Sequence, residues 1–312
     1  MLVKEVLNSG GHIVPLILPE GKEGGIMNPS IYNDNGRLLC NIRHVKYTIY
    51  HSRKYPHTYG PLQYIHAEND RTLRTVNYIA ELDKHLNIIS YAKVDTSTLD
   101  VAPRWEFIGL EDVRLFRWKG SLYQCGVRRD TTTNGVGRME LSELDENFKE
   151  ISRRRLPAPI DTSYCEKNWV PVLDQPYTFV KWTNPTEIVN VEGEVKTTVA
   201  KDNYVSLPRD LRGSSHVVPY KDHYVAIMHE VALYRNQQHQ KDATYLHRFV
   251  IWDKDWNIKF IGEPFSFLGG EIEFCTGAAL YEESLLVSFG HQDNSAYILK
   301  IPLDKLDKLC HL

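Results

Sequence analysis

The sequence predicts an all-β fold, a single five-bladed β-propeller domain spanning residues 1–312. Two observations predict it. A unit of two short apolar strands joined by a polar turn recurs five times, and a second phrase of strand, tight turn and strand recurs three times. A repeat of roughly 40–60 residues that holds four strands is typical of a propeller blade. A β-sandwich whose strands are similar by accident is the alternative.

Each copy of the first unit opens with small or polar residues and ends its second strand at polar or basic residues. The two strands of each copy are, in chain order, 28–32 and 38–43, 111–116 and 121–128, 167–172 and 177–182, 214–219 and 224–229, and 276–280 and 285–290. Hairpin turn residues such as Asp34-Asn35-Gly36 and Lys119-Gly120 join them. The second phrase, at 81–89, 143–151 and 251–258, predicts an outer hairpin in three of the blades.

The step between the first two units is longer than the others and predicts an inserted loop at about 46–75. Aromatic and basic residues alternate in it: Tyr47, Tyr50, Arg53, Lys54, Tyr55, Tyr59, Tyr64, Arg71 and Arg74. Such side chains stack on sugars or bases. Long loops in compact domains are often functional, so we predict a lid, with an ordinary surface loop as the alternative.

Composition limits the class of protein. A net charge of −3 and a pI of about 6.5 argue against a nucleic-acid partner. No apolar run is long enough to cross a membrane, and the first residues lack the apolar core of a signal peptide. The five cysteines are odd in number and widely spaced, which predicts reduced thiols in a cytoplasmic protein, with Cys40, Cys125 and Cys275 buried in strands.

Polar residues open the first strand and close the second strand of every unit, where fold stability does not require charge. The openings are Asn28, Glu111-Asp112, Lys167-Asn168, Ser214-Ser215 and Thr276, and the closings are Arg43-His44, Arg128-Arg129, Lys181-Trp182, His229-Glu230 and His291-Gln292-Asp293. Equivalent positions of all blades meet around one axis, so we predict one shared pocket. Solvated hairpin ends are the alternative.

Glu111 and Asp112 are the candidate acid and its orienting partner. Neighbouring side chains of a strand point to opposite faces, so we expect only one of the two to enter the site directly. Around them the pocket would hold further carboxylates and a larger basic set. Inverting hydrolysis needs an acid and a base. Phosphorolysis needs one acid and a cationic phosphate site, and a transferase must stabilise a departing diphosphate, so the basic set favours these two chemistries.

The order of motifs carries a family resemblance. The motifs are Glu111-Asp112-Val113-Arg114, Lys167-Asn168, Arg212-Gly213-Ser214-Ser215, Met228-His229-Glu230, Cys275-Thr276-Gly277-Ala278 and Phe289-Gly290-His291-Gln292-Asp293. From about Gly25 to Ile301 they resemble those of the five-bladed propeller enzymes of glycoside hydrolase family 130, β-mannoside phosphorylases and hydrolases, and of the related family 108 mannosyltransferases.

The resemblance implies roles for residues of this chain. It implies Asp112 as the proton donor, acting through a sugar hydroxyl. Substrate-binding residues would be Asn28, Arg43, Glu111, Arg114, Asn168, Ser214, Glu230 and Asp293; phosphate-binding residues would be Arg128, Arg129, Lys167 and His229. The chain departs from the family pattern where Val113 replaces a proline, Glu230 a glycine and His291-Gln292 two alanines. A carboxylate at Glu230 would repel a phosphate.

Three functions remain open. The first is an inverting enzyme that transfers a glycosyl group, β-mannosyl by resemblance, to or from phosphate. The second uses a nucleotide sugar such as GDP-mannose on the same propeller. The third is a non-catalytic propeller that binds a glycan or a protein. The expected partner is an oligosaccharide or sugar phosphate, with no cofactor beyond the co-substrate, and the sequence is compatible with a homo-oligomer.

No catalytic metal is expected. The histidines, such as His216, lack the close spacing of metal ligands. The Asp253-Lys254-Asp255 triplet falls in the repeated turn phrase and is interpreted as a structural turn rather than a metal-nucleotide site.

Overall fold

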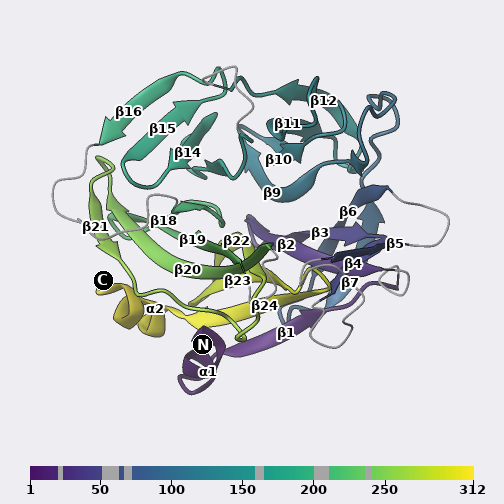
Figure 1. The fold of residues 1–312 in the computed structure, drawn as a ribbon. Helices are drawn as coiled ribbons and strands as arrows, with labels where there is room; N and C mark the ends of the chain where they lie inside the picture. The colour runs from purple at the N-terminus through teal and green to yellow at the C-terminus, as the bar shows by residue number, and fades with distance from the viewer. Residues whose placement is uncertain (20–23, 51–62, 67–71, 159–164, 200–210, 236–240) are drawn as a thin grey trace.

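Five sheets form a ring in the computed structural model, which describes residues 1–19, 24–50, 63–66, 72–158, 165–199, 211–235 and 241–312 (Figure 1). Their strands pair antiparallel, except for the short parallel pairing of residues 73–74 with 107–108. The predicted five-bladed β-propeller is therefore confirmed. Each recurring unit of the sequence forms the two innermost strands of a blade, because its short apolar strands are joined by turns tight enough for a hairpin.

The blades follow one another along the chain. Blade 1 contains β2 (Gly25–Asp34), β3 (Arg37–Val45), β6 (Leu73–Leu82) and β7 (Ile88–Lys93), with β8 (Phe107–Ile108) beside β6. Blade 2 contains β9 (Glu111–Trp118), β10 (Ser121–Arg128), β11 (Arg138–Leu144) and β12 (Glu150–Arg155). Blade 3 contains β13 (Val170–Pro171), β14 (Thr178–Trp182), β15 (Thr186–Asn190) and β16 (Val195–Val199).

The last two blades complete the ring. In blade 4, β17 (Arg212–Gly213) and β18 (Val218–Tyr220) both pair with β19 (His223–Arg235), followed by β20 (Lys241–Asp253) and β21 (Ile258–Ile261). Blade 5 contains β22 (Glu273–Tyr281), β23 (Ser284–His291), β24 (Ser295–Pro302) and β1 (His12–Leu16). β1 pairs with β24 from His12 opposite Lys300 to Leu16 opposite Ala296. A strand from the start of the chain therefore completes the blade that β22, β23 and β24 form near its end.

An apolar cluster fills each of the five interfaces between neighbouring blades. Alternate residues of a strand face opposite sides of its sheet, so each blade packs against both neighbours. Helices α1 (Leu2–Leu7) and α2 (Leu303–Cys310) lie side by side outside blades 4 and 5 and bury Val6, Leu306 and Cys310 in that interface (Figure 1). Neither of these helices, the two that the described ranges contain, is long or apolar enough to cross a membrane.

The second repeated phrase forms outer hairpins, β6–β7, β11–β12 and β20–β21. In each, the turn aspartate (Asp83, Asp145 or Asp253) accepts hydrogen bonds from the backbone N–H groups two and four residues ahead. The interpretation of Asp253 as a turn residue is thus confirmed. Asn190 accepts from the same two positions in blade 3, a fourth copy that the sequence pattern did not reveal because an amide replaces the acid.

The predicted insertion contains a short antiparallel hairpin, β4 (Tyr47–Tyr50) with β5 (Gln63–His66). Residues 51–62 and 67–71, with Arg53, Lys54, Tyr55, Tyr59 and Arg71, lie outside the described residues, so the lid stays a prediction. All five cysteines are free, and Cys40, Cys125 and Cys275 are buried as expected.

Candidate functional site

Three blades carry a polar residue with a left-handed backbone in, or just before, their innermost strand. Asn28, Asp112 and Asn168 have φ values of 44°, 51° and 66°, in the left-handed region. Asparagine and aspartate tolerate this region better than other residues with a Cβ. The strand pairing also shifts register beside the first two, between Met27 and Ser30 and opposite Asp112. Such strain and bulges collect where side chains are aimed at a site.

Asp112 is held between two blades. Its Oδ1 atom accepts hydrogen bonds from Asn28 Nδ2 at 2.8 Å and Arg43 Nη1 at 2.8 Å. Burial opposes ionisation, but Arg43, Lys167 and the Asn28 amide outweigh it, so the pKa of Asp112 lies below its usual value. Asp112 is therefore a carboxylate at neutral pH.

The prediction that Glu111 and Asp112 cannot both enter the site directly is wrong. Arg43 Nη2 lies 3.4 Å from Glu111 Oε2, while Nη1 binds Asp112, so both carboxylates share one guanidinium. Strand alternation would have separated them, but the left-handed backbone at Asp112 breaks the alternation. Arg129 Nε lies 3.9 Å from the other oxygen of Glu111.

Arg43 is itself positioned by residues that sequence reasoning did not select. Its Nε donates to Thr75 Oγ1 at 3.0 Å, and its Nη2 donates to the hydroxyl of Tyr47 at 2.9 Å. Tyr47 begins the inserted hairpin, so its place among the aromatic residues there was the available signal. Nothing in the sequence distinguishes Thr75, because its role depends on the pairing of β3 with β6.

A third carboxyl group, Asp293, belongs to the same cluster. Burial raises its pKa to about 6; Arg43 and Lys167 oppose this rise, and Asp112 and Glu111 add to it. Gln292 and Asp293 both have positive φ, 54° and 48°, in the turn between β23 and β24. The site thus pairs an ionised carboxyl with one that titrates near neutrality, which is a pattern typical of acid–base sites.

His229 and Ser214 extend the site into blade 4. Ser214 Oγ and His229 Nδ1 are 3.0 Å apart, and both side chains are buried. Burial, together with His247, Lys167 and Arg114, holds the pKa of His229 well below its usual value. His229 is therefore neutral at physiological pH.

Arg114 contacts the main chain. Its guanidinium donates to the carbonyl oxygens of Asp112 at 2.8 Å, Ser214 at 2.9 Å and Gly213 at 3.2 Å, and the residue is 1% exposed. In the described structure Arg114 thus fixes the backbone of Asp112 against blade 4. The predicted contact of Arg114 with substrate stays a prediction.

Two other predicted site residues are engaged elsewhere. Arg128 donates to Glu140 Oε2 at 2.6 Å and lies 3.5 Å from Asp130, in a separate polar cluster. Glu230 follows His229 on β19 and binds Arg248 at 3.1 and 3.2 Å. That ion pair compensates the charge that was expected to repel a phosphate.

Several buried polar atoms around the cluster have no hydrogen-bond partner among the described residues: Asn28 Oδ1, Glu111 Oε1, Arg129 Nε, Asn168 Oδ1 and Gln292 Oε1. Buried polar atoms are normally satisfied, and each exception requires an explanation. Four of these atoms are hydrogen-bond acceptors and one, Arg129 Nε, is a donor. A hydroxyl group can both donate and accept, so the set suits a ligand rich in hydroxyl groups.

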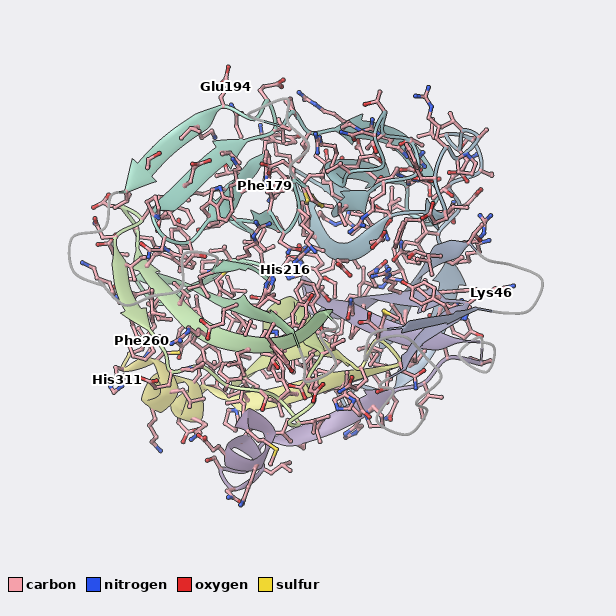
Figure 2. The ribbon with its side chains drawn as sticks, viewed as in Figure 1. Lys46, Phe179, Glu194, His216, Phe260 and His311 are labelled. Carbon is pink, nitrogen blue, oxygen red and sulfur yellow. The ribbon has the colours of Figure 1, made fainter. Side chains whose placement is uncertain are left out.

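His216 has a structural role close to the middle of the ring (Figure 2). Its Nδ1 accepts from the N–H of Ala278 at 3.3 Å and its Nε2 lies 2.8 Å from the Leu115 carbonyl oxygen, to which it therefore donates. Burial lowers its pKa to about 3, so this neutral tautomer joins blades 2 and 5. Within the described ranges no three His, Cys, Asp or Glu residues form a metal-binding group.

The sequence matches no protein-family model and no curated protein, but solved structures share the fold. A β-1,2-mannobiose phosphorylase from Listeria innocua aligns with 11% identity and a TM-score of 0.56, over 95% of this chain and 93% of that one. MPT-1, a GDP-Man-dependent mannosyltransferase from Leishmania mexicana, aligns with 12% identity and a TM-score of 0.57, over 96% and 93%.

A third structure comes from the GH130 family of mannoside phosphorylases, which contains glycoside hydrolases that target β-1,2-mannosidic linkages in Candida mannan. It aligns with 12% identity and a TM-score of 0.55, over 90% of this chain and 85% of that one. The chain is thus structurally similar to GH130 mannoside phosphorylases and to an MPT mannosyltransferase, and it shares their five-bladed propeller.

Proposed function

We propose that the protein is an inverting carbohydrate-active enzyme that transfers a glycosyl group, β-mannosyl in the first instance, to or from phosphate. The observation that carries the proposal is the cluster in which Arg43 holds Asp112 and Glu111 beside Asp293 and Lys167. The shared fold of a mannobiose phosphorylase and a mannosyltransferase supports it.

Asp112 moves the proton of the sugar oxygen in this proposal. In the synthetic direction its carboxylate takes the proton of the acceptor hydroxyl, the acceptor oxygen forms the bond to the anomeric carbon, and the bond to the phosphate oxygen breaks. Phosphorolysis reverses each step, so protonated Asp112 then returns the proton to the departing oxygen.

Lys167 and His229 would hold the phosphate. Lys167 supplies a positive charge to the anionic group, and the neutral ring of His229 supplies a hydrogen bond. Of the two arginines predicted to bind phosphate, Arg129 lies beside Glu111, whereas Arg128 pairs with Glu140 in a separate cluster. Asn28, Asn168 and Asp293 would bind sugar hydroxyl groups.

A nucleotide sugar is the second candidate donor. The lowered pKa of Asp112 favours it, because a carboxylate that is ionised in the free enzyme is ready to accept a proton from an acceptor hydroxyl. The same cations would then stabilise a departing diphosphate.

The test compares three reactions in wild type, Asp112→Asn and Asp304→Asn. Asp304 is a matched control because its side chain is 71% exposed on α2. We would incubate β-mannosides with phosphate, β-mannosides without phosphate, and GDP-mannose with mannose as acceptor. We expect mannose 1-phosphate only when phosphate is present. Its rate of formation should fall at least about a hundredfold in Asp112→Asn, the usual scale of acid–base catalysis, and should be unchanged in Asp304→Asn.

The other outcomes separate the alternatives. Free mannose formed equally without phosphate would make the protein a hydrolase. Turnover with GDP-mannose alone would establish the nucleotide-sugar transferase. Binding of mannosides that Asp112→Asn leaves intact, with no turnover of any substrate, would refute the enzyme and support a glycan-binding propeller.

A further inference from the structure

A polar cavity of about 320 Å³ lies between blades 1 and 2, and Asp112 is not among the residues that line it. The connector that runs from β7 to β8 covers one side of it, and strands of both blades form the rest. Its lining comes from β6, the connector, β10, β11 and β12, together with Asp130, which follows β10.

The inner wall of this cavity consists of buried polar side chains. Gln124, Arg128, Asp130, Ser142 and Glu150 are all at least 96% buried, yet each lines the cavity. Burying polar groups costs free energy unless they are hydrogen-bonded. The interface therefore has to supply hydrogen bonds and ion pairs that offset the cost of burying these five side chains.

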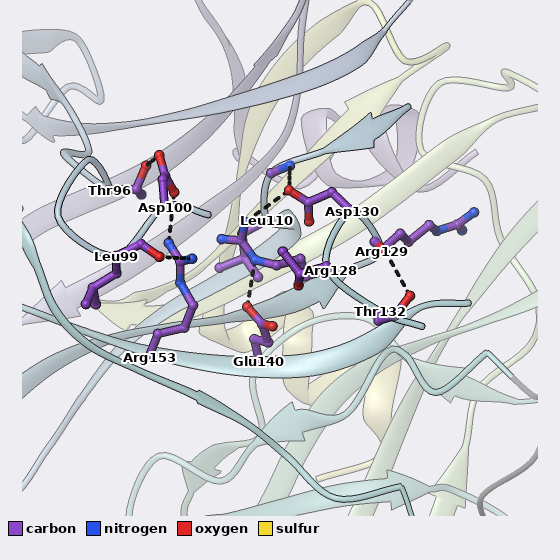
Figure 3. A network of polar contacts seen from close by, with 12 residues as sticks. Thr96, Leu99, Asp100, Leu110, Arg128, Arg129, Asp130, Thr132, Glu140 and Arg153 are labelled. Atoms are coloured by element: carbon purple, nitrogen blue, oxygen red, sulfur yellow. Dashed lines mark hydrogen bonds and ion pairs between the residues drawn. The ribbon is translucent and has the colours of Figure 1, made fainter. Parts of the chain in front are cut away.

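A network of ion pairs fixes this wall (Figure 3). Arg128 lies between Glu140 and Asp130, at 2.6 and 3.5 Å. Arg153 donates to the Leu99 carbonyl oxygen at 3.0 Å and pairs with Asp100 at 3.1 Å, which ties β12 to the connector. Thr96 Oγ1 donates to Asp100 Oδ2 at 2.9 Å.

The blade 1–blade 2 interface has the smallest apolar core of the five. Six buried apolar residues form its cluster, against ten to eighteen in the other four interfaces, counted over the described residues. Polar groups and open volume take the place that apolar side chains fill elsewhere. Packing alone would favour an apolar core here, so a bound ligand is the better explanation of the cavity.

The charges of the lining indicate the chemistry of the ligand. Arg74, Lys93 and Arg128 are cationic and Asp100, Asp130 and Glu150 are anionic, so the lining carries no net charge and favours neither an anion nor a cation. Asp130 Oδ1 is buried with no hydrogen-bond partner among the described residues. A carboxylate oxygen accepts hydrogen bonds, and a neutral ligand supplies them best through hydroxyl groups.

We propose that the cavity between blades 1 and 2 binds a neutral, hydroxyl-rich ligand, a sugar residue, at a second site distinct from the Asp112 cluster. Its volume is at the lower end of the range of about 300–1,000 Å³ typical of ligand pockets, which suits one or two sugar units.

The two sites share a wall. Asn77 Nδ2 donates to the Leu110 carbonyl oxygen at 2.8 Å, and Asp130 Oδ2 accepts from the N–H of Gly109 at 3.3 Å. Gly109 and Leu110 directly precede Glu111 and Asp112. Thr75, which lines the cavity, also accepts from Arg43. The second site thus lies against the segment that leads into Glu111 and Asp112.

The test uses D-mannose as the probe and reads binding, so it does not depend on turnover. Crystals of the wild type, Asp130→Asn and Val101→Trp would be soaked with mannose, and mannose affinity would be measured by calorimetry. Val101 is 64% exposed at the edge of the cavity, so a tryptophan there obstructs it without a folding defect. Val195→Trp, at a residue 50% exposed on blade 3, is the matched control.

We expect mannose in the cavity of the wild type with a hydroxyl group on Asp130 Oδ1. Asp130→Asn should weaken this site at least tenfold, Val101→Trp should abolish it, and Val195→Trp should leave it unchanged. Mannose confined to the Asp112 site, or a stoichiometry that Val101→Trp does not reduce, would overturn the proposal. Failure of every turnover assay with mannose bound in the cavity would refute the proposed function and leave this inference standing.

Discussion

At the scale of single residues, Arg43 is the centre of the candidate site. Its three nitrogens reach Thr75, Tyr47 and the two carboxyl groups of Glu111 and Asp112. A guanidinium presents its donors in a fixed plane, so anchoring one edge sets the direction of the other. Tyr47 and Thr75 therefore act on Asp112 through Arg43.

Replacing Tyr47 by phenylalanine tests this anchoring. Arg43 should lose part of its hold on Asp112, so the pKa of Asp112 should rise toward its usual value. In the synthetic direction, where ionised Asp112 accepts the proton, the acid limb of the pH–rate profile should move to higher pH. The kcat should fall about tenfold or more, since a hydrogen bond to a charged group contributes roughly 1.5–3 kcal/mol. Tyr91→Phe on the outer strand β7 is the control. An unmoved acid limb would show that Tyr47 does not position Asp112.

Asp293 predicts a pH dependence of anion binding. Its pKa is about 6, so the carboxyl is neutral below that pH and charged above it. A charged Asp293 repels an anion on Lys167, and affinity should therefore rise as pH falls through 6. Sulfate is a suitable probe because it stays a dianion from pH 5 to 8. We expect about tenfold tighter sulfate binding at pH 5 than at pH 7.5, the equivalent of one pKa unit of charge interaction.

The matched variant for this experiment is Asp293→Asn, which keeps the shape and removes the titration. Its sulfate affinity should be nearly constant across the same pH range and should resemble that of the wild type at pH 5. A pH dependence that survives in Asp293→Asn would assign the effect to another group.

The residue scale also shows where sequence reasoning fails. The candidate residues Asn28, Arg43, Glu111, Asp112 and Asp293 do come together, because their places at strand ends follow from the repeat. Their orientations did not follow from it. A left-handed φ at Asp112 is not visible in the letters Glu-Asp, and it overturned the expectation that the two carboxylates face apart.

At the scale of elements, the outer hairpins depend on one turn residue each. Asp253 accepts two backbone N–H groups and the amide of Asn257, and it pairs with Lys259. Asp255, two residues away, enters this turn through its N–H group. In the triplet Asp253-Lys254-Asp255, the side chain of Asp253 therefore stabilises the turn, whereas Asp255 contributes its backbone N–H group.

Alanine at each of these acids separates a turn from a metal site. Asp253→Ala should lower the free energy of unfolding by about 1–2 kcal/mol, because it leaves turn N–H groups without their acceptor, and Asp255→Ala should change it by less than about 0.5 kcal/mol. Urea unfolding of both variants checks this. A Mn²⁺-dependent activity that both substitutions abolish would contradict the structural interpretation.

Hairpins were predictable because their signals are local. Turn residues and short apolar strands lie within about fifteen residues of each other, and they located all five inner hairpins. The cavity between blades 1 and 2 was not predictable in this way. Its wall combines β6, a connector and three strands of blade 2, and Arg128 was assigned to phosphate because nothing in the sequence shows that Glu140 and Asp130 surround it.

At the scale of the whole molecule, stability depends on ring closure by β1. Leu16, at the end of β1, is 3% exposed and packs in the cluster between blades 5 and 1, whereas its neighbour Ile17 is 75% exposed. A buried leucine truncated to alanine typically costs about 2–5 kcal/mol. Truncation should therefore lower the free energy of unfolding strongly at Leu16 and weakly at Ile17, the residue after the strand.

Leu16→Ala and Ile17→Ala form the matched pair. We expect Leu16→Ala to lower the free energy of unfolding by at least about 2 kcal/mol and Ile17→Ala to leave it within about 0.5 kcal/mol. Chemical denaturation with the slope of the transition recorded checks both. Equal free energies of unfolding for the two variants would mean that the packing of Leu16 at the end of β1 does not stabilise the closed ring.

The pairing of β1 with β24 also delays completion of blade 5 during synthesis on the ribosome. Residues 12–16 leave the ribosome before the strand that they pair with, which begins at residue 295, about 280 residues later. At about 5–20 residues per second, β1 waits roughly 15–55 s as an unpaired edge. During that interval the nascent chain exposes a strand that other polypeptides can capture, so chaperone occupancy should be greatest before the last blade emerges.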